Sequence, residues 1–142
     1  MRSKQGVANS YNRGDSINAI NWGLKTVHRD VFDYVKGMIA LRKGHPAFRM
    51  GNPDLIRRHL EFIHVPATNV VAFRLKGNPC GDHWLNTIVI LNARTEPIKV
   101  QIPDGKYWVA CRDGRVDLVL GLGVIQGNEV TVSPVSALII HQ

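Results

Sequence analysis

The residues best suited to bind a ligand lie near the start of the chain, where polar side chains crowd into little more than a dozen positions. They are Asn9, Ser10, Tyr11, Asn12, Asp15, Asn18 and Asn21. Carboxylates and amides hydrogen-bond in pairs to hydroxyl groups, and an aromatic ring packs on apolar faces. No periodicity runs through residues 1–29, so the sequence predicts a loop with one turn near Arg13 and Gly14. Binding residues concentrate on loops, although an ordinary surface loop has the same composition.

Catalysis by two carboxylates requires a pair of acids that have no other role. The acids of the loop and the helix that follows are Asp15, Asp30 and Asp33. We expect Asp30 to cap the helix and Asp33 to lie on its outer face, which leaves no pair. The histidines show no i, i+4 spacing, and His45, just before Pro46, is better suited to a loop contact than to a base. The sequence therefore predicts no catalytic residue.

Metal and cofactor motifs are weak. Cys80 and His83 have the spacing of half a metal site, but the sequence offers no second half. Two cysteines are too few for a disulfide framework, so Cys80 and Cys111 are expected to be free thiols. The glycines of 121–127 miss the dinucleotide-binding spacing by one residue, and no helix follows them. We expect no metal, no cofactor and a simple strand connection there.

The element that follows the polar loop is an amphipathic helix predicted over Asp30–Lys43. Its apolar residues Val31, Val35, Met38, Ile39 and Leu41 recur at helical spacing. Asp30 is the expected N-cap, Gly44 the expected residue after the last turn, and Pro46 prevents continuation. A second short helix is predicted to start with Asn52 as N-cap and Pro53 at its first position, and to run to about His59.

The rest of the chain has the short, closely spaced strands of an antiparallel β-sandwich. The predicted strands are 60–65, 69–75, 87–92, 98–102, 106–112, 116–120, 130–132 and 137–141. Hairpin turns are expected at Asp104–Gly105, Asp113–Gly114 and Gly127–Asn128. The expected core is Phe62, Val71, Phe73, Ile88, Ile90, Val100, Val109, Val132, Leu138 and Ile140. The predicted fold is therefore mainly β, preceded by a loop and a helix.

The charge is distributed unevenly. Residues 1–60 hold 11 Lys and Arg against four Asp, whereas residues 61–142 hold seven residues of each sign. A basic nucleic-acid adaptor is one interpretation, but neither interleaved aromatic residues nor a known binding motif accompanies the charge. No apolar run is long enough to cross a membrane, and no secretory signal follows the basic start, so we expect no membrane partner and predict no compartment.

Two motifs carry a resemblance to a known family. The first is Asn9-Ser-Tyr-Asn12 followed by Asp15, Asn18, Ile20 and Trp22. The second is Lys36-Gly-Met-Ile-Ala-Leu-Arg-Lys-Gly-His-Pro-Ala-Phe-Arg-Met50. Together they resemble type I pullulanase, a debranching glycoside hydrolase of the α-amylase superfamily. The match is close over residues 1–50 and departs from the family pattern at Asn21, where the family usually has Asp.

The resemblance implies a division of the chain. Residues 1–50 would be the last loop and helix of a truncated (β/α)8 barrel, and residues 51–142 a C-terminal antiparallel β-sandwich domain. The family hydrolyses α-1,6 branches in pullulan, glycogen or starch dextrins with retention, using carboxylates from motifs upstream of this chain. We therefore expect a C-terminal fragment that is inactive alone and serves carbohydrate metabolism through the parent enzyme.

The same resemblance implies substrate contacts and partners. Asp15 and Asn18 occupy positions where related enzymes direct polar side chains at sugars, and Asn9 and Tyr11 are weaker candidates. The expected partners are the α-glucan substrate and the missing catalytic barrel. A second copy of the chain is a further expected partner, through Val31, Val35, Met38 and Ile39.

The alternative function is a stand-alone carbohydrate-binding or scaffold β-domain. Only Trp84, Tyr107 and Trp108 could supply the aromatic surface for carbohydrate binding. Strand alternation places Tyr107 and Trp108 on opposite faces.

Overall fold

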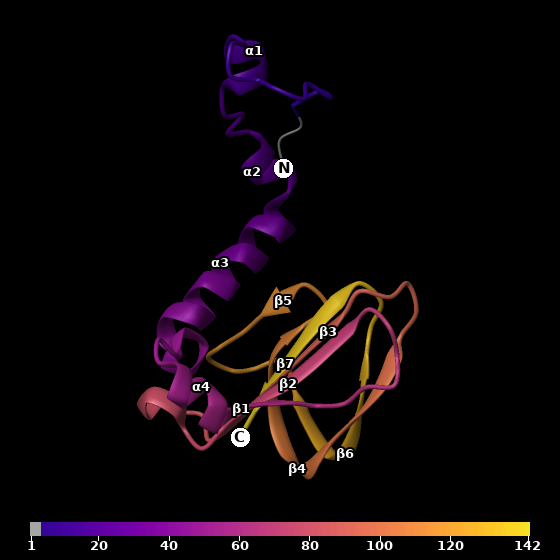
Figure 1. Ribbon diagram of the computed structural model, residues 1–142. Coiled ribbons are helices and arrows are strands. Elements are labelled where there is room, and N and C mark those ends of the chain that lie inside the picture. The colour runs from indigo at the N-terminus through magenta and orange to yellow at the C-terminus, as the bar shows by residue number, and fades with distance from the viewer. Residues whose placement is uncertain (1–3) are drawn as a thin grey trace.

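The computed structural model describes residues 4–142, so the first three residues of the predicted 1–50 unit lie outside the described residues. A long helix rises from a β-sheet domain and carries the N-terminal loop at its far end (Figure 1). The helices are α1 (Asp15–Asn18), α2 (Leu24–Val27), α3 (Arg29–Gly44) and α4 (Pro53–His59), with 3-10 turns η1 (Pro46–Arg49) and η2 (Pro79–Gly81). The helix predicted over Asp30–Lys43 is thus confirmed as α3.

The seven strands in the described part of the chain form one antiparallel sheet in the order β1-β2-β3-β7-β4-β5, with β6 pairing to β4. They are β1 (Leu60–Phe62), β2 (Val70–Lys76), β3 (Asn86–Asn92), β4 (Ile98–Arg112), β5 (Arg115–Val116), β6 (Val124–Val132) and β7 (Ser136–His141). The antiparallel, mainly β prediction is confirmed. The sandwich is built from a single sheet whose β2–β3–β7 side packs against its β4–β6 side across one core.

Two of the three predicted hairpin turns are wrong. Asp104–Gly105 lies inside the long strand β4, where the pairing register with β6 shifts between Gln101 and Gly105. Gly127 lies inside β6, directly opposite Gly105. The two glycines lie opposite each other at an irregularity in a continuous pair of antiparallel strands. In the sequence, such an irregularity has the same residues as a hairpin turn. Asp113–Gly114 does connect β4 to β5, and both residues have positive φ, as a tight hairpin requires.

Most of the predicted core is confirmed. Ile88, Ile90, Val100, Val109, Val132, Leu138 and Ile140 are buried together, with Tyr107 among them. The other three predicted residues lie on the outer face of the sheet, where β1 is an edge strand. Phe62 is 70% exposed, Val71 is 46% exposed, and Phe73 packs partly on a separate cluster. The alternation in β2 buries Ala72 in the core, so its neighbours Val71 and Phe73 face outward.

The outer face of the sheet has its own apolar cluster, which α3 covers in part. Leu41 of α3 is buried against Val89, Ala110, Cys111 and Ile139 of the sheet. Tyr34, Met38 and Phe48 pack partly on this cluster. The C-terminal half of α3 is therefore folded against the sheet. Some apolar side chains of α3 are buried against this cluster, and the others remain exposed.

The ends of α3 differ from expectation at two positions, one of which is Gly44, the last residue of the helix and not the residue after it. His28, not Asp30, precedes the first turn of α3, and no side chain caps that end. Asn52 does cap α4, because its Oδ1 accepts a hydrogen bond from the Asp54 amide at 2.8 Å. The predicted polar loop contains the short helices α1 and α2, besides the expected turn in which the Arg13 amide donates to the Ser10 carbonyl.

Both cysteines are free, as predicted: Cys80 is exposed and Cys111 is buried. Burial raises the pKa of the Cys111 thiol above its usual value. Within residues 4–142, no helix is both long and apolar enough to span a membrane.

Candidate functional site

The predicted substrate residues lie in the N-terminal segment, but they do not all point toward solvent. The Asn18 amide donates to the Ser10 carbonyl at 2.8 Å and to the Arg13 carbonyl at 2.6 Å, and its oxygen accepts from Lys4 Nζ at 2.9 Å. The Asn9 side chain accepts a hydrogen bond from the Tyr11 amide at 3.1 Å. Both asparagines therefore use their polar atoms to hold the loop in shape.

Asp15 and Tyr11 are the candidates that remain open to a ligand. Tyr11 is 90% exposed. Asp15 opens the single turn of α1 and lines a hollow of about 450 Å³ together with Ser16 and Asn21. Of the four predicted residues, Asp15 and Tyr11 are thus exposed to solvent, while the two asparagine side chains stabilise the shape of the loop.

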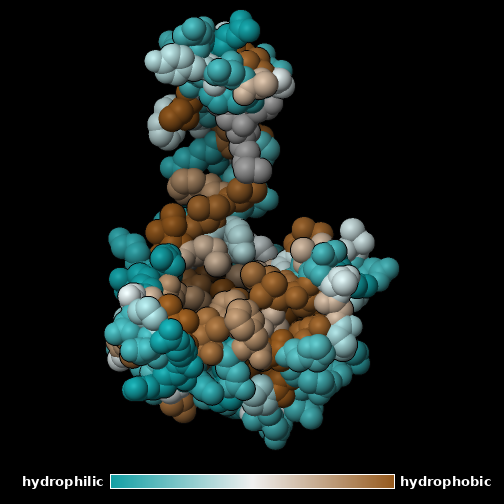
Figure 2. All heavy atoms as spheres, in the orientation of Figure 1, coloured by the Kyte–Doolittle hydropathy of each residue, from teal (hydrophilic) through white to brown (hydrophobic). Residues whose placement is uncertain are grey.

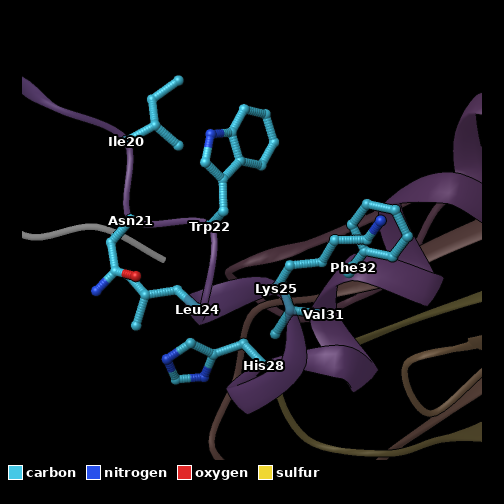
Figure 3. A pocket seen from close by; sticks show the side chains of 8 residues that line it. All are labelled: Ile20, Asn21, Trp22, Leu24, Lys25, His28, Val31 and Phe32. Atoms are coloured by element: carbon cyan, nitrogen blue, oxygen red, sulfur yellow. The ribbon is translucent and has the colours of Figure 1, made fainter.

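A second, apolar hollow adjoins the first, and Figure 3 shows the side chains that line this second hollow. It measures about 270 Å³ and shares Ile20, Asn21 and Leu24 with the polar hollow. The side chains of Asn21 and Trp22 project in opposite directions from the connecting chain. Trp22 is 74% exposed, and it was not among the predicted substrate residues, although it belongs to the same motif. An exposed tryptophan beside a carboxylate-lined hollow can pack on an apolar ligand face or on another protein surface.

Lys25 and Phe32 form the helical wall of the apolar hollow. The Lys25 ammonium lies 4.4 Å from the centre of the Phe32 ring, close enough for a cation–π contact. The two acids of the first turns of α3 point elsewhere. Asp33 accepts a hydrogen bond from Arg29 Nε at 2.7 Å, and Asp30 is exposed. Neither acid lines either hollow.

A third, apolar hollow lies between α3 and the outer face of the sheet, and Figure 2 shows it in brown below the helix. We call it the apolar groove. It has a volume of about 480 Å³ and is lined by Tyr34, Val35, Met38, Ile39, Leu41, Arg42, Phe48, Phe73, Val89, Leu91, Ala137 and Ile139. Val35 is 48% exposed, Ile39 55% and Leu91 43%. Apolar side chains gathered and exposed in this way are typical of a surface that another protein covers.

The aromatic residues considered for carbohydrate binding do not form a platform. Tyr107 is buried in the core, and its hydroxyl donates to the Pro103 carbonyl at 2.9 Å. Trp84 is stacked between two histidine rings. Trp108 is 43% exposed, on the opposite face of the strand from Tyr107, as predicted, and Trp84 is half-buried. The geometry thus gives the stand-alone carbohydrate-binding alternative no support.

Comparison with known proteins agrees with this architecture. Residues 56–115 match the family described as pullulanase, all-beta domain. Pullulanase of Bacillus subtilis (strain 168) is 37% identical over 112 residues, and isoamylase of a Flavobacterium species is 24% identical over 135 residues. These alignments cover 78% and 80% of this chain, but only 16% and 17% of the relatives.

Solved structures match the helical segment as well as the sheet. Pullulanase from Bacillus acidopullulyticus superposes with a TM-score of 0.94 at 40% identity, over 99% of this chain and 17% of that one. Type I pullulanase from Bacillus subtilis str. 168, solved with maltose, gives a TM-score of 0.89 at 32% identity, over 99% of this chain and 19% of that one. Residues 56–115 are thus a pullulanase all-beta domain, and the helical segment before them is similar in structure to the same part of pullulanases. The chain spans about one-sixth to one-fifth of the length of these relatives.

Proposed function

We propose that this chain works as the C-terminal part of a type I pullulanase, which hydrolyses α-1,6 branches in pullulan, glycogen or starch dextrins. In this proposal residues 1–50 complete a (β/α)8 barrel, and residues 51–142 form the β-domain beside it. The chain contributes support and substrate contacts, while the catalytic carboxylates come from the remainder of the enzyme. The observation that carries the proposal is the superposition on pullulanase over 99% of the chain, α3 included.

The apolar groove is the surface we assign to the barrel. One wall is the exposed stripe of α3, and the other is the outer face of β2, β3 and β7. Burying a side chain of the size of Ile39 is worth about 1.5–3 kcal/mol, so several residues of this size favour a covering partner. The excess of basic residues in 1–60 favours a partner surface with acidic residues around an apolar centre.

The substrate contacts we propose follow from the loop. Asp15 is the residue we assign to a sugar hydroxyl, since its carboxylate is exposed in the polar hollow. Tyr11 is a second contact through its exposed phenol. Asn9 and Asn18 take part by shaping the loop, because their side chains are already hydrogen-bonded to it.

A chimera tests this proposal. The segment of the Bacillus subtilis pullulanase that aligns with this chain is replaced by residues 1–142, and reducing-sugar release from pullulan is measured. We expect the chimera to be active, Asp15→Ala to raise KM more than it lowers kcat, and the isolated chain to release no sugar. A chimera that folds but does not hydrolyse pullulan would contradict the proposal. Glu61→Ala, on the exposed edge strand β1, is the control and should leave both constants unchanged.

A further inference from the structure

A buried carboxylate joins the end of α3 to the β-sheet domain. Asp82 follows η2 and is only 4% exposed. Its oxygens accept hydrogen bonds from His45 Nδ1 at 2.9 Å, the Ala47 amide at 3.0 Å and the Trp84 amide at 3.0 Å. His45 and Ala47 come from the turn between α3 and η1. We call Asp82 and its partners, together with His141, the α3 corner.

A stack of rings continues from this carboxylate into the sheet. The His45 and Trp84 ring centres lie 3.5 Å apart, and those of Trp84 and His141 lie 3.8 Å apart with nearly parallel planes. The Trp108 ring follows at 6.1 Å from His141. Trp84 is therefore held between an imidazole of the helical segment and an imidazole of β7. The stack ties α3 to the two central strands β7 and β4.

Two titratable groups of the α3 corner, Asp82 and His141, have different surroundings. Burial raises the pKa of Asp82, but hydrogen bonds from Trp84, His45 and Ala47 outweigh burial and hold that pKa below its usual value. His141 has a buried Nδ1 without a hydrogen-bond partner among the described residues. Burial first, and the charge of His45 second, lower the pKa of His141 from 6.5 to about 4, with Asp82 opposing.

The other neighbours of His141 do not compensate a proton on its ring. Thr87 of β3, directly opposite His141 in the sheet, is uncharged. On the β4 side, the Lys106 ammonium lies 5.5 Å from the Trp108 ring centre. Arg74 of β2 is bound to Asn86, which in turn donates to Gln142. Within residues 4–142, Asp82 is thus the one carboxylate that acts on His141, and it already accepts three hydrogen bonds.

We propose that the α3 corner is an acid-sensitive latch, closed near neutral pH and opened locally by protonation of His141. In the open state His141 is solvated and regains its ordinary affinity for a proton. The open state therefore binds more protons than the closed state between pH 6.5 and about 4. The closed state is fully favoured above this window, and the preference decreases as the pH falls through it. Opening would release the end of α3 from the sheet and change its angle to the β-domain.

Hydrogen exchange of the 142-residue chain, followed by NMR, tests the latch. Protection factors of the Ala47 and Trp84 amides are compared at about pH 7.5 and about pH 4.5, with the core amides of Ile88 and Ile90 as internal references. We expect the two corner amides to lose about tenfold or more in protection at the lower pH, while the core amides keep theirs. The variant His141→Phe, which can stack but cannot titrate, should abolish most of this loss. The variant His64→Gln, at an exposed histidine, should behave like the wild type.

Two results would overturn the latch. One is the same loss of protection in the wild type and in His141→Phe. The other is a simultaneous loss at Ile88 and Ile90, which would mean global acid unfolding. If His141→Phe does not fold, the His141 ring is titrated by NMR in the wild type. A midpoint well below 6.5 that coincides with opening at Ala47 supports the latch, and an ordinary midpoint with a closed corner contradicts it.

Discussion

Gly37 of α3 and Val116 of β5 are in such close contact that a β-carbon added at Gly37 would lie 2.6 Å from the Val116 Cβ. The contact is made by the middle of the helix and the edge of the sheet, and it brings Tyr34 and Leu41 onto the outer cluster. Glycine in a helix interior is unfavourable by about 1 kcal/mol relative to alanine. The sequence alone therefore indicates a weak point in the helix, whereas the structure shows a position where a larger residue does not fit.

Gly37→Ala should destabilise the chain in spite of its better helix propensity. The added methyl group meets a branched carbon next to the backbone, and overpacking of this kind costs about 1–3 kcal/mol. The control is Gly44→Ala, at the last residue of the same helix, where an added β-carbon meets nothing within 4 Å. Thermal unfolding should show a lower midpoint for Gly37→Ala and an equal or higher one for Gly44→Ala. Equal stabilisation by both changes would contradict the contact.

The two faces of the sheet should respond differently to truncation. Ile90 is completely buried in the core, so Ile90→Ala should lower the free energy of unfolding by about 2–5 kcal/mol. Phe62, which the sequence placed in the core, is 70% exposed, so Phe62→Ala should have a much smaller effect. Denaturant unfolding of both variants measures the difference. A comparable loss in both would mean that Phe62 is covered in solution.

The sequence predicted those elements whose signals are local. The apolar spacing of α3 and the Asn52–Pro53 start of α4 were sufficient for two helices. The prediction of two separate strands in place of β4 was wrong because Asp104–Gly105 has the composition of a hairpin turn. The element that keeps the strand continuous is distant in sequence, because β6 pairs with β4 both before and after this dipeptide. Such a constraint has no local signature.

The candidate site was predictable only in part, for a similar reason. The motif identified the loop, but it could not separate the asparagines that hold the loop from the carboxylate that lines a hollow. The α3 corner could not be predicted at all, because His45 and Asp82 are separated by 37 positions in sequence. The expectation that His45 makes a loop contact is nevertheless confirmed by its hydrogen bond to Asp82.

Removing the Asp82 carboxylate should be costly and pH-dependent. Asp82→Ala leaves the buried His45 and two amides without their acceptor, so we expect a loss of about 3–5 kcal/mol at neutral pH. Because the folded pKa of Asp82 is lowered, its contribution is complete above its ordinary pKa of 3.8 and is lost as the pH falls through the lower folded value. The free energies of unfolding of wild type and variant should therefore converge in strong acid. The control Asp54→Ala, in an exposed pair with Arg57, should change little at either pH.

Self-association is expected while the apolar groove is uncovered. Val31, Val35 and Ile39 are exposed on α3, and Met38 lies at the groove beside them. Sedimentation at roughly tens of micromolar should show dimers for the wild type and monomers for Val35→Glu/Ile39→Glu. A wild-type monomer whose α3 amides remain protected from exchange would mean that packing on the sheet already suffices.

Binding between this chain and the remainder of a pullulanase tests the central claim most directly. The partner is the Bacillus subtilis pullulanase without the segment that aligns with residues 1–142, titrated by calorimetry. We predict binding at about micromolar affinity or tighter, with the negative heat-capacity change of apolar burial, and at least about tenfold weaker binding by Val35→Glu/Ile39→Glu. The absence of binding by a folded wild-type chain, or equal binding by the variant, would contradict the claim that α3 and the apolar groove receive the barrel.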